Sequence, residues 1–150
     1  MTYVLERELF IPRPRDEVFA FFADAFNLER ITPPFLSFHI VTPKPIAMRA
    51  GTCIDYKMGL YGMRFLWKTR IAAYEPPCLF VDEQLKGPYR RWVHRHSFEE
   101  SAGGTLMRDR VEYAVGFGPL GVLAHRLFVR RSVEQIFDFR NATIQEIMGH

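Results

Sequence analysis

The sequence has little cysteine and no long apolar run. Its 150 residues include two cysteines, Cys53 and Cys78, whose spacing fits neither a CxxC motif nor a zinc site, so we expect both to be passive. No apolar run approaches the roughly 20 residues of a membrane-spanning helix. Glu6, Arg7 and Glu8 lie where a signal peptide would be apolar. We therefore expect a cytoplasmic protein with reduced thiols.

Motifs of the common enzyme classes are also missing. The sequence contains no G-x-S-x-G, G-x-G-x-x-G, G-x-x-x-x-G-K-[ST] or H-E-x-x-H pattern. The usual serine-hydrolase, nucleotide-binding and zinc-protease sites are thereby excluded, and we expect no cofactor. Lys and Arg outnumber Asp and Glu by only 20 to 17, and the charges are scattered. This pattern is typical of a solvated surface, and it permits an anionic partner without requiring one.

Aromatic side chains, by contrast, are numerous. The chain contains 14 Phe, 6 Tyr and 2 Trp at a length that suits one domain, which we place at residues 1–150. Hydrophobic residues make up 48% of the chain, so wholesale disorder is excluded. The rings are more than one small core needs. They either form a solid core or line an apolar ligand cavity.

Prolines separate segments of different hydrophobic period. A strand is expected at residues 3–11, followed by a helix whose first turn carries Asp16 and Glu17, and by a short helix at residues 24–31. Alternating patterns then predict six strands, at residues 35–41, 52–60, 63–74, 79–86, 89–98 and 106–115. A single apolar stripe predicts one long helix from Leu120 to about Met148.

This order, β-α-α-β6-α, predicts an α+β fold. Short connections between successive strands imply antiparallel pairing, so we expect a curved antiparallel sheet of about seven strands. The last helix would be on the order of 40 Å long and would pack against the concave face of the sheet. A gap between sheet and helix would be lined by large rings.

Two histidines interrupt this apolar inner face. In the strand at residues 89–98, Trp92, His94, His96 and Phe98 share one face, and the apolar pair indicates that this face points inward. Pairing with the next strand would bring Asp109 close to His96 and near His94. The group fits a metal site, a general acid–base pair or a ligand-orienting network. We favour the network and expect no metal.

Basic residues lie at the alternate positions of these strands, on the opposite face from the histidines. Arg91, Arg95, Arg108 and Arg110 would face outward without interleaved aromatics, so we expect no nucleic-acid binding. Three further arginines on the last helix, at positions 126, 130 and 131, would allow at most a transient contact with an anionic membrane.

The central motif resembles a known superfamily. The pattern F-x-D-x-Q-x-x-G-P-[YF]-x-x-W-x-H-x-H-x-F, characteristic of the bacterial ligand-binding branch of the SRPBCC (START, polyketide-cyclase and birch-pollen-allergen-like) superfamily, is present here. It reads Phe80, Asp82, Gln84, Gly87, Pro88, Tyr89, Trp92, His94, His96 and Phe98. The similarity continues through Asp109, Tyr113, the joint at residues 117–121, and Arg140. Gly116 stands where the branch often has proline, which affects only backbone stiffness.

The resemblance implies a helix-grip fold and a function in binding or transporting a small hydrophobic ligand, lipid- or polyketide-like. We expect the ligand between the sheet and the last helix. The candidate ligand-binding residues are Tyr56, Met58, Trp67, Asp82, Gln84, Trp92, His94, His96, Phe98, Asp109, Tyr113, Leu127 and Phe128. The register of residues 79–86 is open, so either Asp82 with Gln84 or Glu83 faces inward.

Two other functions are compatible with the sequence. One is an enzyme of polyketide-cyclase or dehydratase type, with His94 or His96 as the acid–base group and Asp109 setting its tautomer. The other is an accessory or interaction module, such as a homodimer, which predicts a solid core. Fold alone does not decide among the three.

Overall fold

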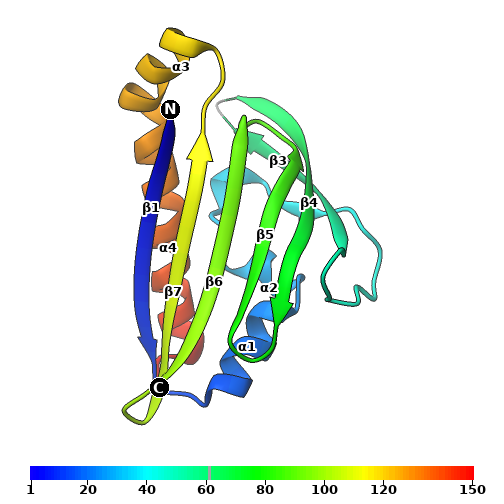
Figure 1. Ribbon diagram of the computed structural model, residues 1–150, viewed down its shortest axis with the longest axis vertical. Helices are drawn as coiled ribbons and strands as arrows, with labels where there is room; N and C mark the ends of the chain where they lie inside the picture. Colours follow the sequence, from blue (N-terminus) through cyan, green and yellow to red (C-terminus); the bar gives the residue numbers. More distant parts are fainter. Residues whose placement is uncertain (61) are drawn as a thin grey trace.

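Seven strands form one antiparallel sheet in the computed structural model, which describes residues 1–60 and 62–150. The strands are β1 (Thr2–Ile11), β2 (His39–Ile40), β3 (Cys53–Leu60), β4 (Met63–Glu75), β5 (Leu79–Lys86), β6 (Arg91–Ser101) and β7 (Gly104–Ala114). Their spatial order is β1-β7-β6-β5-β4-β3-β2, so all strands from β2 to β7 pair with their neighbours in sequence. Figure 1 shows this order, with β1 closing the sheet beside β7.

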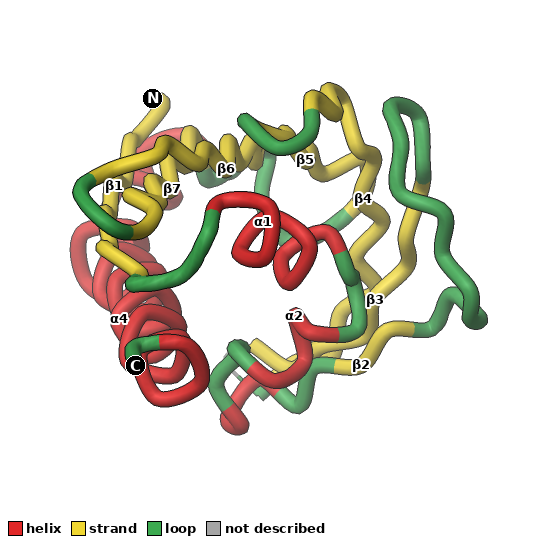
Figure 2. Tube along the Cα trace, turned by 90° about the horizontal axis from the view of Figure 1, so that it is seen from below, coloured by secondary structure: helices red, strands yellow, loops and turns green. Residues whose placement is uncertain are grey.

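The helical segments lie on the inner side of this sheet. They are α1 (Arg15–Ala23), α2 (Asn27–Arg30), α3 (Gly118–Ala124) and α4 (Arg130–Met148), with a 3₁₀ turn at Pro34–Leu36 and a π-helical turn at His125–Val129. Figure 2 shows the sheet curving around the interior, with α4 along the side next to β1 and with α1 and α2 across the lower end. This is the α+β fold predicted from the element order, in the helix-grip form that the family resemblance implies. No helix in the described part of the chain is long and apolar enough to cross a membrane.

The last helix follows the prediction with one irregularity. Residues 118–148 are helical throughout, but the π-helical turn separates α3 from α4. The buried residues of α4 include Val133, Phe137 and Ile144, which belong to the predicted apolar stripe. At the joint before α3, a Cβ on Gly121 would lie 1.7 Å from the carbonyl oxygen of Gly116. Only glycine fits there, which explains one of the glycines of this joint.

The segment 35–41 differs from the prediction of a strand. Only His39–Ile40 pairs with β3, and residues 34–36 form a single 3₁₀ turn. Pro33 and Pro34 favour the turn, and Ser37 leaves it in the left-handed conformation at φ 46°, which interrupts any extended run. The helix expected at residues 24–31 is likewise shorter, because α2 spans one turn.

The aromatic residues divide between two hydrophobic clusters. One lies under α1 and packs Phe19, Phe22, Phe80 and Phe98 together, with ring centroids 5.4–6.2 Å apart in contacts involving Phe19, Phe80 and Phe98. The other surrounds the middle of the sheet and includes Tyr56, Trp67, Trp92, Tyr113 and Phe137. The first cluster is close-packed core. The second borders the cavity described below.

Candidate functional site

A cavity of about 140 Å³ lies between the inner face of the sheet and the helices. Most of its walls are apolar and come from α1, α2, the 3₁₀ turn, the strands β3 to β6, the β5–β6 turn and α4. They include Phe21, Leu28, Leu36, Ile54, Tyr56, Met58, Trp67, Tyr89, Trp92 and Phe137. Two charged side chains, Asp82 and Arg140, and two imidazoles, His94 and His96, line the same cavity. The site therefore combines apolar walls with one polar region.

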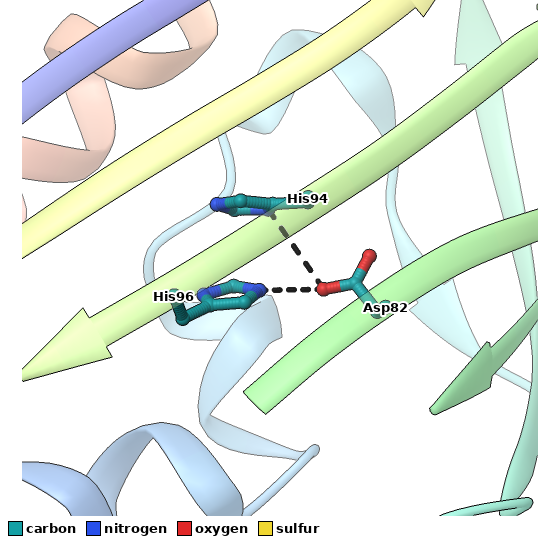
Figure 3. Close-up of side chains that lie close together, drawn as sticks. All are labelled: Asp82, His94 and His96. Atoms are coloured by element: carbon teal, nitrogen blue, oxygen red, sulfur yellow. Dashed lines mark hydrogen bonds and ion pairs between the residues drawn. The ribbon is translucent and has the colours of Figure 1, made fainter. Parts of the chain in front are cut away.

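The polar region begins at a contact between β5 and β6. Asp82 lies opposite His94 in the strand register, yet its Oδ2 atom bonds the Nε2 atom of His96 at 2.5 Å. The distance from Asp82 Oδ2 to His94 Nδ1 is 3.8 Å, too long for a hydrogen bond. Figure 3 shows the carboxylate facing the two imidazoles, whose rings stack with centroids 3.6 Å apart.

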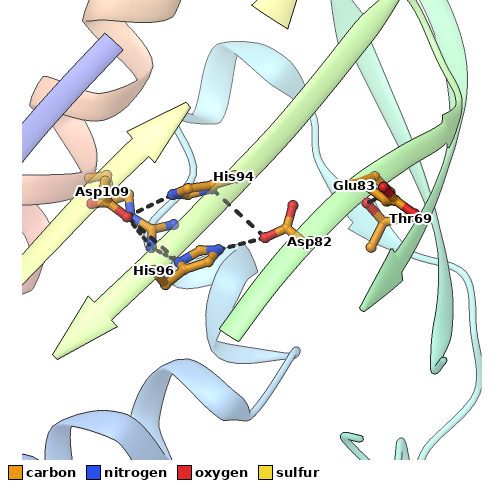
Figure 4. A network of polar contacts seen from close by, with 7 residues as sticks. Thr69, Asp82, Glu83, His94, His96 and Asp109 are labelled. Atoms are coloured by element: carbon orange, nitrogen blue, oxygen red, sulfur yellow. Dashed lines mark hydrogen bonds and ion pairs between the residues drawn. The ribbon is translucent and has the colours of Figure 1, made fainter. Parts of the chain in front are cut away.

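Asp109 on β7 makes the reciprocal contact. It lies opposite His96 in the register, but its Oδ1 atom bonds Nε2 of His94 at 2.7 Å. Figure 4 shows the histidines between the two carboxylates. From α4, Arg140 places Nη2 at 3.4 Å from Asp109 Oδ1 and at 3.2 Å from His96 Nδ1. Three strands and the last helix thus meet in one polar network.

Arg140 fixes the tautomer of His96. A guanidinium group only donates, so Nδ1 of His96 accepts and Nε2 carries the proton that it donates to Asp82. Burial lowers the pKa of His96 to about 4, and the charge of Arg140 acts in the same direction. His96 is therefore neutral near pH 7, with both ring nitrogens in use.

The two carboxylates are ionised. Burial alone would raise the pKa of Asp109, but the charge of Arg140 and the hydrogen bond from His94 hold it well below its ordinary value. For Asp82, burial is likewise outweighed, chiefly by the hydrogen bond from His96, and the pKa is lowered. Burial and the negative charge of Asp82 raise the pKa of Tyr56, so that hydroxyl stays protonated.

A metal ion would need different proton positions. Ligand atoms of Asp82, His94 and His96 lie within 4.8 Å of one another, so the candidate triad contains Asp82 in place of the expected Asp109. Coordination by Nε2 of His96 requires a lone pair on that atom and a proton on Nδ1. Arg140 donates to Nδ1, which opposes that tautomer. The donor set therefore favours a hydrogen-bonded network over a cation site.

Seven of the thirteen candidate residues line the cavity: Tyr56, Met58, Trp67, Asp82, Trp92, His94 and His96. The sequence left two registers open for residues 79–86, and in the structure Asp82 faces inward. Glu83 faces outward and pairs with Arg70. Gln84 does not line the cavity. It makes two hydrogen bonds with the backbone of Tyr89, through Nε2 at 2.6 Å and Oε1 at 3.2 Å, and so braces the turn between β5 and β6.

The other candidates lie outside the cavity walls. Asp109 is fully buried behind the histidines, and Phe98 belongs to the cluster under α1. Tyr113 is buried and its hydroxyl group lies 2.8 Å from Nε2 of His125. Leu127 and Phe128 are exposed and line a separate surface groove. Neither residue lines the cavity described here.

Arg140 is the site residue that residue-by-residue reasoning missed. It is only 4% exposed, and its guanidinium carbon lies 5.2 Å from the ring centroid of Phe22 and 5.8 Å from that of Phe137. The available signal was its position, because Arg140 falls on the apolar stripe of α4 between Phe137 and Ile144. A single arginine on a buried stripe indicates a buried anionic partner.

Comparisons with known proteins agree with this fold. A family model described as polyketide cyclase / dehydrase and lipid transport matches residues 11–140. No curated protein matches the chain by sequence. Solved structures with the same fold include TTHA0849 from Thermus thermophilus, with 18% identity and a TM-score of 0.67 over 97% of this chain and 99% of that one.

Two further solved structures share this fold. Ara h 8.0201 has 18% identity and a TM-score of 0.65, covering 97% of this chain and 99% of that chain. The di-domain ARO/CYC StfQ from the steffimycin biosynthetic pathway has 14% identity and a TM-score of 0.76, covering 99% of this chain and 51% of that chain. The family model covers most of the sequence, and the chain therefore belongs to the polyketide cyclase / dehydrase and lipid transport family of the SRPBCC superfamily.

Proposed function

We propose that the cavity binds a small, mostly apolar molecule of about the size of one aromatic ring, whose hydrogen-bond donor is held by Asp82. The observation that carries the proposal is an apolar cavity with one ionised carboxylate in its wall. Ligand sites in proteins commonly combine apolar walls with a few convergent polar groups. The family and the fold agree with a ligand-binding role.

The size of the cavity limits the ligand. In another protein, an apolar cavity of roughly 150 Å³ binds benzene. The cavity here has about 140 Å³, so a single ring with one or two small substituents fits. A long acyl chain or a multi-ring polyketide would require α1 or α2 to move.

Asp82 is the carboxylate of the network that the ligand can reach. Its side chain is 19% exposed, whereas that of Asp109 is 0% exposed. An ionised carboxylate accepts several hydrogen bonds, and His96 occupies only one oxygen of Asp82. A phenol, alcohol or amine would supply the donor that fits there.

Trp67 offers a second polar contact. It lines the cavity, and its buried indole N–H has no hydrogen-bond partner among the described residues. A ligand carbonyl or ether oxygen within reach would satisfy this donor, and buried donors without partners are costly. The proposed ligand class is therefore a small ring compound with a donor and, as a second group, an acceptor.

The geometry supports binding more than acid–base catalysis by histidine. Both ring nitrogens of His96 are engaged, and His94 donates to Asp109. The lowered pKa of Asp82 makes it a weak base near pH 7. A cavity also fits poorly with the solid core expected of a pure interaction module.

Native mass spectrometry combined with fluorescence tests this proposal. The chain has only two tryptophans, Trp67 and Trp92, and both line the cavity, so their emission reports its occupancy. We expect phenol to change the emission saturably, and a retained small organic mass to be lost on denaturation. Emission that is unaffected by phenol, together with an empty protein, would contradict the proposal.

A further inference from the structure

One end of the molecule exposes many large apolar side chains. They come from the β3–β4 hairpin and from the helical segment 117–131, and include Met63, Phe117, Leu120, Leu123, Leu127 and Phe128. Figure 1 shows α3 and this hairpin together at the upper end, opposite α1. We call this surface the apolar end.

Five of these six side chains line two adjoining grooves. Phe128 lies in a groove with Met63, Arg64 and Leu127, and also in a neighbouring groove with Phe117 and Leu120. The hairpin and the helical segment therefore meet through Phe128. Contiguous exposed apolar surface of this kind marks an interaction site in soluble proteins.

The backbone at Phe117 supports an interaction role. This residue is 86% exposed and has φ 69° and ψ 22°, in the left-handed region that residues with large side chains rarely adopt. Such a conformation carries strain, and burial of the ring does not compensate for it. The strain instead holds an aromatic side chain in solvent at the start of α3.

The charged side chains of the apolar end are basic. Residues 56–74 and 113–133 contain no Asp or Glu. Arg64, Arg126 and Arg131 are exposed and form no ion pair with any other described residue. The outer face of the sheet is different, because Arg108 there pairs with Glu8 and Glu99.

We propose that the apolar end docks onto an anionic membrane surface. Exposed apolar side chains can enter the region between headgroups and acyl chains, while the arginines contact lipid phosphates. A second copy of the chain fits less well. A two-fold interface would place this basic surface against itself, and like charges would oppose each other. The proposal does not depend on the identity of any cavity ligand.

Cosedimentation with vesicles tests the proposal. We expect the protein to bind phosphatidylglycerol vesicles but not phosphatidylcholine vesicles, and added salt to weaken the binding. The double variant Arg126→Gln/Arg131→Gln should bind roughly 30-fold more weakly, since each basic residue near such a surface contributes about 1 kcal/mol. The control Arg91→Gln/Arg108→Gln removes the same net charge from the outer face of the sheet and should bind nearly as well as the wild type.

The apolar contribution has its own variant and control. Phe117→Ser/Leu120→Ser should also lose binding, whereas Val4→Ser/Leu85→Ser, at exposed apolar positions on the sheet, should retain it. Hydrogen exchange of the unmodified protein should slow in residues 117–131 when phosphatidylglycerol vesicles are added. Three outcomes would overturn the proposal: equal binding to both lipids, equal loss in the control variants, or a dimer by light scattering that Phe117→Ser/Leu120→Ser dissociates.

Discussion

Asp82 and His96 are bonded across a diagonal of the sheet, not across a directly opposed pair. Asp82 faces His94 in the register of β5 and β6, yet its hydrogen bond goes to His96. Asp109 faces His96 and bonds His94. Each carboxylate thus holds the more distant imidazole, and the two crossed bonds connect three strands. The consequence is a rigid polar wall in which only Asp82 is partly open to the cavity.

The ion pair between Arg140 and Asp109 should dominate the stability of this wall. Arg140→Met leaves a buried carboxylate without its cation, which costs about 3–5 kcal/mol in the free energy of unfolding. Urea denaturation measures the change. Adding Asp109→Asn to this variant should recover part of the loss, and Arg91→Gln on the exposed face should change stability little. Equal effects of Arg140→Met and Arg91→Gln would contradict the assignment.

His96 should make the protein less stable in mild acid. Its pKa is about 4 in the fold and 6.5 ordinarily, so between these values the unfolded chain binds a proton that the folded chain does not. The contribution of His96 to the free energy of unfolding is therefore constant above about pH 6.5. It falls as the pH decreases toward 4, by on the order of 2 kcal/mol between pH 7 and pH 5. The pKa of Asp82 is lowered from 3.8, so its contribution is lost only at still lower pH.

The variant His96→Gln isolates this effect. Its amide can still donate to Asp82 but does not titrate, so its stability should change less between pH 7 and pH 5 than that of the wild type. Buried His125, whose pKa is also lowered by burial, titrates in both proteins and cancels in the comparison. Parallel pH profiles for the two proteins would show that the pKa of His96 is not lowered in the fold.

Gly121 should be intolerant of any side chain. Gly121→Ala places a Cβ against the Gly116 carbonyl and should destabilise the protein by about 1–3 kcal/mol or more through overpacking at the start of α3. Thermal unfolding followed by circular dichroism gives the measurement. Gly116→Ala is the matched control, because a Cβ there meets nothing within 4 Å. Equal melting temperatures for the two variants would show that the Gly116 carbonyl does not restrict the residue at position 121.

Much of the fold followed from the period of the sequence. Strand parity predicted the inward face of β6, and the short hairpin to β7 predicted the pairing of His96 with Asp109, because both depend on local geometry. The crossed hydrogen bonds did not follow, since they depend on side-chain rotamers. The sequence also did not determine which face of β5 points inward. The β4–β5 pairing is irregular between Lys68 and Thr69 and between Ile71 and Ala73, so the alternation of side chains along β4 does not predict the alternation along β5.

The role of Arg140 required the tertiary structure. Its partners are 31 and 44 residues away in the sequence, and the packing of α4 against the sheet determines which of them it meets. The sequence places Leu127 and Phe128 among the candidate ligand-binding residues. The π-helical turn at His125–Val129 and the exposure of these two residues put them at the apolar end instead.

The proposed role of Asp82 is to hold the donor group of a ring-sized ligand. Titration calorimetry with phenol and toluene, which have similar shapes, tests this role when wild type, Asp82→Asn and the outward-facing control Glu83→Gln are compared. We expect wild type and Glu83→Gln to bind phenol roughly 10- to 100-fold more tightly than toluene, as a hydrogen bond to a charged group should provide. Asp82→Asn should lose most of that preference while still binding toluene. Equal affinities for phenol and toluene in the wild type, or a preference unchanged in Asp82→Asn, would show that Asp82 does not hold the donor group.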